Sequence, residues 1–218
     1  MERVDLKSRQ RVIDHGEVFT PPQIVDQMLE LVARECERVD SRFLEPACGT
    51  GNFLAEILAR KLRLVQRSCS NLRRRWERDS IVALGSVYGI DLLGDNVLDC
   101  QARLVLTLQS ASKSCLGEPL SEEMHRAARF IASRNVIHGD ALALRAADGS
   151  PIVFSEWSPV SSTMIKRRDF KFDHLLGHAE VRSSPLFSDL GQDVFLPSPA
   201  GDYPPCHYLE VCSRGRVE

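Results

Sequence analysis

The stretch Phe43-Leu-Glu-Pro-Ala-Cys-Gly-Thr-Gly-Asn-Phe-Leu54 decides the fold that this sequence predicts. It begins as a short apolar strand that ends on an acidic residue, passes through a glycine-containing turn and then enters a helix. Gly49 and Gly51 lack a Cβ, so the backbone can turn sharply there and a ligand can approach it closely. A strand, a glycine turn and a helix in this order are typical of α/β proteins that hold a nucleotide-like ligand.

The helix after the turn is indicated by apolar residues that recur at helical spacing. These residues are Phe53, Leu54, Ile57, Leu58, Leu62 and Val65. The glycine spacing is not the Gly-x-Gly-x-x-Gly of dinucleotide-binding folds, and no Gly-Lys-Ser/Thr follows, which argues against a nicotinamide cofactor and against a P-loop. We interpret Cys48, inside the turn, as a packing residue and not as a nucleophile.

Length and composition limit the class of protein. The 218 residues suffice for one α/β domain with a buried core, and the formal net charge of −2 excludes a global basic field for nucleic acid. The seven cysteines form no Cys-x-x-Cys pair and no signal peptide precedes them, which favours reduced thiols over disulfides or zinc. Apolar runs are shorter than a membrane span. We therefore expect a soluble, cytoplasmic protein without a metal site or a membrane partner.

A second informative stretch, Glu17-Val-Phe-Thr-Pro-Pro22, precedes the strand and leads into an amphipathic helix. Thr20 is suited to be the N-cap of this helix, Pro21 its first residue and Gln23 the third member of a capping box. The mostly polar residues 1–16 before it predict a surface segment.

Two later strands are each predicted to end at an acidic residue. Ser86–Ile90 is followed by Asp91, and Asn135–His138 is followed by Gly139 and Asp140. A carboxylate at the end of the second strand can accept two hydrogen bonds from a pair of ribose hydroxyls. The first of these acids lies farther from the glycine turn than the usual ~20 residues, and an insertion at 67–79 accounts for the excess.

Two basic clusters allow two interpretations. The first surrounds Trp76 within residues 67–79, and the second lies at residues 166–168. Either could be a solvated surface, or the arginines beside an exposed aromatic ring could contact DNA phosphates. The residues that would make such contacts are Arg73, Arg74, Arg75, Lys166, Arg167 and Arg168.

Four stretches together resemble the S-adenosylmethionine-binding half of adenine-N6 DNA methyltransferases, of the kind found as modification subunits of restriction systems. They are residues 17–22, 43–54, 89–91 and 135–142. The resemblance covers residues 15–142, roughly three-fifths of the chain. It implies a Rossmann-like, three-layer α/β sandwich with a mostly parallel sheet, and a cofactor over the carboxyl ends of the strands.

The resemblance also implies cofactor contacts. Glu45 would reach the ammonium group of S-adenosylmethionine, Asp91 the ribose hydroxyls and Asp140 the adenine amino group, with Ala141 or Leu142 beside the ring. Because the cofactor carries an ammonium and a sulfonium, acidic strand ends suit it better than a cationic phosphate-binding loop. The other residues implied around it are Phe19, Thr20, Pro21, Pro46, Ala47, Gly49 and Gly51.

The catalytic tetrapeptide of that family is absent. The family carries Asn/Asp-Pro-Pro-Tyr/Phe at the end of strand four, where it binds the target amine and stacks on a flipped base. A candidate fourth strand, Pro151–Trp157, ends on Glu156 and Trp157, an acceptor and an aromatic residue in a different order. Phe172-Asp173 resembles the Phe-Asp that often opens that strand, but His174-Leu-Leu-Gly-His178 follows it.

Several functions therefore stay open. The chain could be a DNA methyltransferase-like protein of a restriction-modification or phage-defence system that lacks independent catalysis, needs a partner subunit, or uses Glu156 and Trp157 as an unorthodox site. It could instead be a non-catalytic cofactor-sensing or DNA-binding accessory module, or a small-molecule methyltransferase, which residues 17–22 disfavour. The expected partners are DNA and a restriction or specificity subunit.

Three segments are expected along the chain. Residues 1–16 form a surface segment, residues 17–176 a methyltransferase-like domain, and residues 177–218 a proline-punctuated arm that needs a partner or the domain surface for order.

Overall fold

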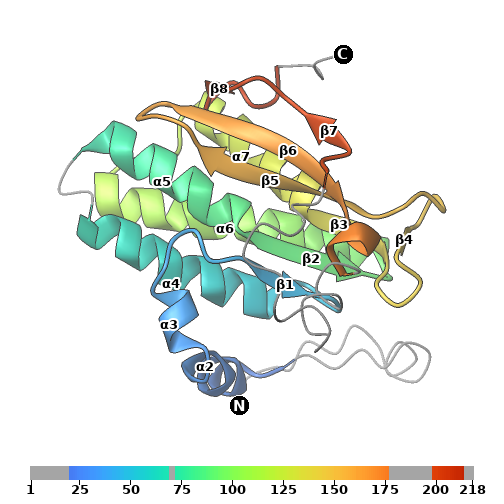
Figure 1. Cartoon of the computed structure of the whole chain (residues 1–218). Coiled ribbons are helices and arrows are strands. Elements are labelled where there is room, and N and C mark those ends of the chain that lie inside the picture. The colour runs from blue at the N-terminus through green and yellow to red at the C-terminus, as the bar shows by residue number, and fades with distance from the viewer. Residues whose placement is uncertain (1–19, 69–71, 177–197, 214–218) are drawn as a thin grey trace, which may run out of the picture.

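The computed structural model describes residues 20–68, 72–176 and 198–213. Its first sheet contains β1 (Phe43–Glu45), β2 (Val87–Asp91), β3 (Val136–Asp140) and β4 (Arg145–Ala146), in that order (Figure 1). β1 to β3 are parallel, and the short β4 is antiparallel to β3. The fold is therefore mixed α/β with a mostly parallel first sheet, and the predicted acidic residues end its parallel strands.

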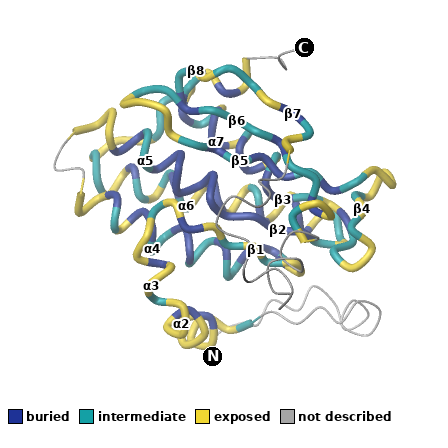
Figure 2. Tube along the Cα trace, in the orientation of Figure 1, coloured by how far each residue is buried: buried dark blue, intermediate teal, exposed yellow. Residues whose placement is uncertain are grey.

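Helices between the parallel strands cover one face of this sheet. They are α4 (Asn52–Ser68), α5 (Arg73–Gly85), α6 (Gly94–Leu116) and α7 (Glu122–Asn135). Because the strand order runs in one direction, right-handed connections put these helices on the same side. Their apolar faces form one core with Val87 and Val136, and Figure 2 shows the buried positions of α5 and α6 at the centre of the molecule. The Ser121 hydroxyl accepts the N–H of Met124 at 3.2 Å and caps α7.

The first described helix, α2 (Pro22–Glu30), begins differently from the prediction. Pro21 is its N-cap, has an extended backbone, and its carbonyl accepts the N–H groups of Ile24 and Val25 at 3.0 and 3.1 Å. No side chain caps the helix, so the predicted capping box of Thr20 and Gln23 is wrong. The reason is local. Pro21 precedes Pro22, and a residue before a proline is held in an extended conformation, so Pro21 cannot be the first helical residue and takes the N-cap position. A short helix, α3 (Ala33–Cys36), follows.

An antiparallel sheet covers the other face of β2 and contains β5 (Val153–Pro159), β6 (Met164–Lys171), β7 (Gly201–Asp202) and β8 (Cys206–His207). Phe154 of β5 packs with Phe172 against Tyr88 and Ile90. The predicted fourth strand therefore exists, but it pairs with β6 in a hairpin and does not extend the parallel sheet. Residues 172–176 are helical, so the Phe172-Asp173 pair does not open a strand.

Part of the predicted C-terminal arm belongs to the folded domain. β7 and β8 both pair with β6, and Tyr208 and Val211 are buried in the main core. The Tyr208 hydroxyl donates to the Glu77 carboxylate at 2.8 Å, which joins this segment to α5. Residues 198–213 thus pack into the domain, whereas residues 177–197 and 214–218 lie outside the described residues.

Among the described helices, none combines the length and the apolar character that crossing a lipid bilayer requires.

Candidate functional site

Asp91, at the end of β2, holds the glycine turn in place. Its Oδ2 accepts the N–H of Gly49 at 2.8 Å, and its Oδ1 accepts the N–H of Leu93 at 2.9 Å and the side-chain amide of Asn96 at 3.3 Å. Gly49 has a φ of 53°, in the left-handed region that favours glycine. Each carboxylate oxygen has two lone pairs, so the half-buried Asp91 keeps acceptor capacity for a further donor.

Two buried cysteines, Cys48 and Cys100, fill the space next to Gly89 and Gly51, so larger residues would not fit at these two glycine positions. A Cβ on Gly51 would lie 2.6 Å from the Cys100 sulfur, and a Cβ on Gly89 would lie 2.9 Å from the Cys48 sulfur. The hydrogen bond between the two thiols, together with burial, raises the pKa of Cys48 far above its usual value. A thiol held in the protonated form is a poor nucleophile, which agrees with the interpretation of Cys48 as a packing residue.

Glu45, at the end of β1, is half-buried beside the turn. Burial raises the pKa of its carboxyl group above the usual value, and the N–H of Ala47 offsets part of that increase. Because burial penalises the carboxylate, a cation bound next to Glu45 would favour its charged form. Pro46 and Ala47, which follow it, are exposed at the same end of the strand.

Asp140, at the end of β3, completes a row of three acidic residues at one edge of the sheet. β1 and β2 pair Glu45 with Gly89, and β2 and β3 pair Asp91 with His138, so these strands end close together. Asp140 Oδ1 accepts the N–H groups of Leu142 and Ala143 in the following loop, at 2.8 and 3.2 Å. Ala141 is half-buried in this loop, whereas Leu142 is 97% exposed.

The segment before α2 lies against the same turn. The side-chain amide of Asn52 donates to the carbonyl of Thr20 at 3.5 Å. Thr20 and Pro21 are thus brought to the glycine turn, although they are about thirty residues away in the chain. Phe19, which the sequence also assigns to this place, lies outside the described residues.

Glu156 and Trp157, the candidates for an unorthodox catalytic site, lie at the opposite end of the sheet. The Trp157 indole N–H donates to Asn135 Oδ1 at 3.2 Å, and Asn135 directly precedes β3. Glu156 pairs with Arg42, which directly precedes β1. Neighbouring strand residues also point to opposite faces, so the two side chains cannot act on one substrate atom. Glu156 and Trp157 therefore lie away from the acidic strand ends and do not converge with them on one site.

The first basic cluster is largely paired with acidic residues. Arg73 donates to Glu77 at 2.9 Å and also pairs with Glu118, and Arg75 lies 3.7 Å from Asp79. Trp76 is 1% exposed and faces the core, so the interpretation as arginines beside an exposed aromatic ring is wrong. Arg74 is exposed on the same helix.

The second basic cluster lies on β6 and is paired as well. Lys166 lies 2.9 Å from Asp202, Arg167 lies 2.7 Å from the buried Asp169, and Arg168 lies 3.0 Å from Glu156. Lys166 and Arg167 each have an acidic partner of their own, which does not favour a phosphate-binding patch, whereas Arg168 shares Glu156 with Arg42.

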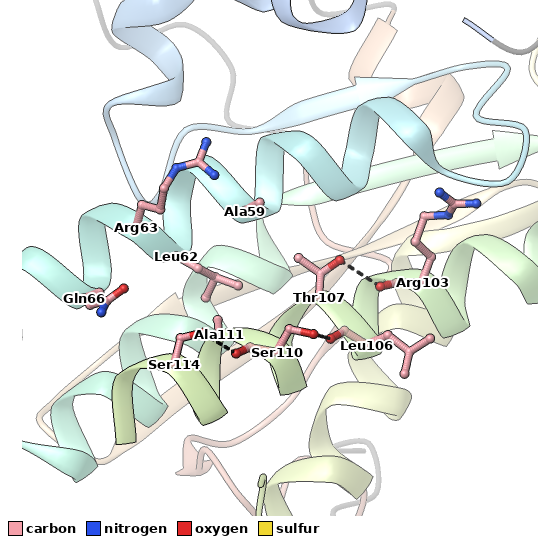
Figure 3. Close-up of a pocket in the computed structure, with 10 residues that line it drawn as sticks. All are labelled: Ala59, Leu62, Arg63, Gln66, Arg103, Leu106, Thr107, Ser110, Ala111 and Ser114. Atoms are coloured by element: carbon pink, nitrogen blue, oxygen red, sulfur yellow. Dashed lines mark hydrogen bonds between the residues drawn. The ribbon is translucent and has the colours of Figure 1, made fainter. Parts of the chain in front are cut away.

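A groove of about 410 Å³ lies between α4 and α6, away from the acidic row (Figure 3). Its hydroxyl groups are occupied, because those of Thr107, Ser110 and Ser114 donate to main-chain carbonyls one turn earlier at 2.9 to 3.0 Å. Arg103, at one end, donates to the Thr50 hydroxyl of the glycine turn at 3.4 Å. With these hydroxyl groups satisfied internally, this groove is a weaker candidate for a cofactor site than the acidic row.

Two polar residues of the site were not predicted from the sequence. Asn96 supports Asp91 from the first turn of α6 and is 1% exposed, and Asn52 holds the segment before α2. The sequence could have pointed to Asn96, because it directly precedes Val97, the first residue of the apolar face of that helix. For Asn52 the signal was its place at the end of the glycine turn.

Comparison with protein-family models, curated proteins and solved structures gave no match. Within residues 20–68, 72–176 and 198–213, no group of histidine, cysteine and acidic side chains is arranged to hold a metal ion.

Proposed function

We propose that this chain binds S-adenosylmethionine at the carboxyl ends of β1 to β3, as the cofactor-binding half of a DNA adenine-N6 methyltransferase-like protein of a restriction-modification or phage-defence system. The observation that carries the proposal is the 2.8 Å hydrogen bond from the Gly49 N–H to Asp91. It joins the glycine turn after β1 to the acidic end of β2, the position at which α/β folds receive a ribose.

The charges of the site favour this ligand over a phosphate-containing cofactor. Glu45, Asp91 and Asp140 end adjacent strands, and the pKa of Glu45 is already raised by burial. An ammonium group near Glu45 would relieve this penalty, and the remaining acceptor site of Asp91 suits a ribose hydroxyl. A phosphate group would be repelled by the same row.

The proposal does not include independent methyl transfer. Glu156 and Trp157 lie at the amino ends of the parallel strands, opposite to the carboxyl ends at which we propose the cofactor. Among the alternatives, this location favours a non-catalytic cofactor-binding module, or a chain whose catalytic residues come from a partner subunit.

Calorimetry with S-adenosylmethionine and S-adenosylhomocysteine tests the cofactor site. We expect Asp91→Asn and Asp140→Asn to weaken binding by about tenfold or more, because each loses hydrogen bonds to a charged acceptor. Asp202→Asn, with the same change of charge on β7, should bind like wild type. Undetectable binding by folded wild-type protein would refute the cofactor proposal.

Incubation with methyl-labelled cofactor and adenine-containing DNA tests catalysis separately. We expect no label in the DNA when this chain is the sole protein. Transfer by the chain alone would overturn the proposal that it lacks independent catalysis, and would leave cofactor binding intact.

A further inference from the structure

We propose that the edge of β1 that faces away from β2 binds an extended peptide segment of a partner protein, with an apolar side chain in an adjacent cavity and an acidic side chain beside Arg42 and Arg168. This inference is independent of cofactor binding, because it concerns the opposite side of β1 and different atoms.

The first observation is that no residue in the described part of the chain pairs with the outward-facing main chain of Leu44. In the described part of the chain, β1 has β2 as its single neighbouring strand. The N–H of Phe43 donates to Ser86 on the β2 side at 3.0 Å, and in a parallel ladder successive residues alternate in direction. The N–H and C=O of Leu44 therefore point away from β2. Such an edge is a template for another strand.

The second observation is an apolar cavity of about 400 Å³ along this edge. Its aromatic wall is rigid, because Phe154 makes edge-to-face contacts with Tyr88 at 5.3 Å and with Phe172 at 5.5 Å between ring centroids. The Tyr88 hydroxyl is occupied by the carbonyl of Ser155 at 3.1 Å, so its ring acts as an apolar surface. Leu44 is 41% exposed at this place and would be covered by a bound side chain.

The third observation is an excess of positive charge at one end of the cavity. Glu156 pairs with both Arg42 and Arg168, so two guanidinium groups share one carboxylate. Among the described atoms, the buried Nε of Arg168 has no hydrogen-bond partner. An additional carboxylate near Arg42 and Arg168 would balance the charge. A small shift of the Arg168 side chain would let its Nε–H donate to that carboxylate.

These observations together specify a peptide and not a small apolar molecule. A small molecule could fill the cavity, but it would leave the N–H and C=O of Leu44 unpaired. An extended segment satisfies the main chain, fills the cavity with every second side chain and carries the required carboxylate.

The test uses isotopically labelled full-length chain and short capped peptides of alternating valine and threonine, with a central phenylalanine and a glutamate at one end or the other. We expect saturable binding of at least one of them, and at least about tenfold slower hydrogen exchange at the Leu44 amide in the complex. The Phe43 amide, already bonded to Ser86, should change little and serves as an internal control. A glutamine-for-glutamate peptide should bind more weakly, and Arg168→Gln should abolish that difference.

Two substitutions at one position separate the main chain from the side chain. Leu44→Pro removes the outward N–H without removing a hydrogen bond of the β1–β2 ladder, whereas Leu44→Ala keeps it. We expect the proline variant to bind the peptide about tenfold more weakly than the alanine variant. Equal binding by the two, or binding of a peptide with a fully N-methylated backbone, would show that the main chain is not recognised and would overturn the proposal.

Two further results would assign the edge to a different occupant. Strong protection of the Leu44 amide in the free, monomeric chain would mean that the chain itself covers it. Concentration-dependent dimerisation with protection of that amide would assign the edge to a second copy. Either result would overturn the peptide proposal.

Discussion

The hydroxyl of Tyr208 donates to the carboxylate of Glu77 at 2.8 Å, although the two residues are 131 positions apart. Both side chains are buried, and Glu77 also accepts a hydrogen bond from Arg73 at 2.9 Å. The contact joins the last described segment of the chain to α5.

Removing this hydroxyl should destabilise the whole domain. Tyr208→Phe leaves the buried Glu77 carboxylate with one donor fewer, and we expect the free energy of unfolding to fall by about 1–3 kcal/mol. Urea unfolding followed by circular dichroism measures the change. Tyr203→Phe is the matched control, because its acceptor Asp169 keeps donors from Ser155 and Arg167, so the loss should be smaller. Equal losses would contradict this account of Tyr208.

Adding a methyl group at position 51 of the glycine turn should destabilise the protein. Gly51→Ala combines a φ of 85° with a Cβ only 2.6 Å from the Cys100 sulfur, and we expect a loss of about 2–4 kcal/mol in stability. Gly117→Ala has a similar φ of 74° but nothing within 4 Å, so it isolates the backbone cost of about 1 kcal/mol. Thermal unfolding of both variants tests the difference. Adding Cys100→Ala to Gly51→Ala should recover part of the loss, and no recovery would mean that the contact is unimportant.

Cofactor affinity should depend on pH through Glu45. Burial raises the pKa of this carboxyl group in the folded protein, so its contribution to stability is present below the unfolded pKa and is lost as pH rises through the folded pKa. A bound ammonium group reverses the penalty, so affinity for S-adenosylmethionine should rise with pH over that range and binding should release a proton. Calorimetry in buffers of different ionisation enthalpy measures the release. Glu45→Gln should abolish it, and an unchanged release would assign the proton elsewhere.

Lys61 should make stability rise with pH in the alkaline range. Its ammonium group is fully buried and donates to Ser86 Oγ at 2.6 Å and to the carbonyl of Val39 at 3.2 Å, yet burial lowers its pKa from 10.5 to about 8. Between these values the unfolded chain binds the extra proton, so Lys61 should contribute an increase of up to about 3 kcal/mol to the free energy of unfolding from pH 8 to pH 10.5, visible as the difference between wild type and Lys61→Met. The buried Cys48 thiol acts in the opposite direction in both proteins. Denaturant unfolding across this range should lack the increase in Lys61→Met. A parallel increase in that variant would assign the effect to other groups.

Much of the first sheet could be predicted because its signals are local. Apolar runs ending at Glu45, Asp91 and Asp140, and the glycine turn between a strand and a helix, each lie within a few residues of the chain. The parallel pairing then follows from the intervening helices. The same local signals correctly predicted that these acids would lie at one edge.

The errors arose where the structure depends on distant contacts or on backbone geometry. Trp76 looked exposed among arginines, but it lies on the face of α5 that also carries the buried Ser80 and Ala83, a helical period that was available in the sequence. β5 pairs with β6 in a hairpin and packs against α5 and α7, whereas the sequence placed it as the fourth strand of the parallel sheet, which is why Glu156 and Trp157 were expected at the carboxyl end of that sheet. At Pro21, the effect of the following proline on the backbone outweighed capping preference.

β5 connects the two apolar cores of the molecule. Its Phe154 belongs to the cluster on the sheet face, and its Trp157, three residues later, belongs to the core formed by the helices. The indole is bonded to Asn135 and would collide with a methyl group on Gly85, since that Cβ would lie 2.8 Å from the ring. A hairpin inserted into both cores cannot detach while either remains packed. The domain should therefore unfold as one cooperative unit, with the slowest-exchanging amides of the hairpin opening together with those of α5 and α7.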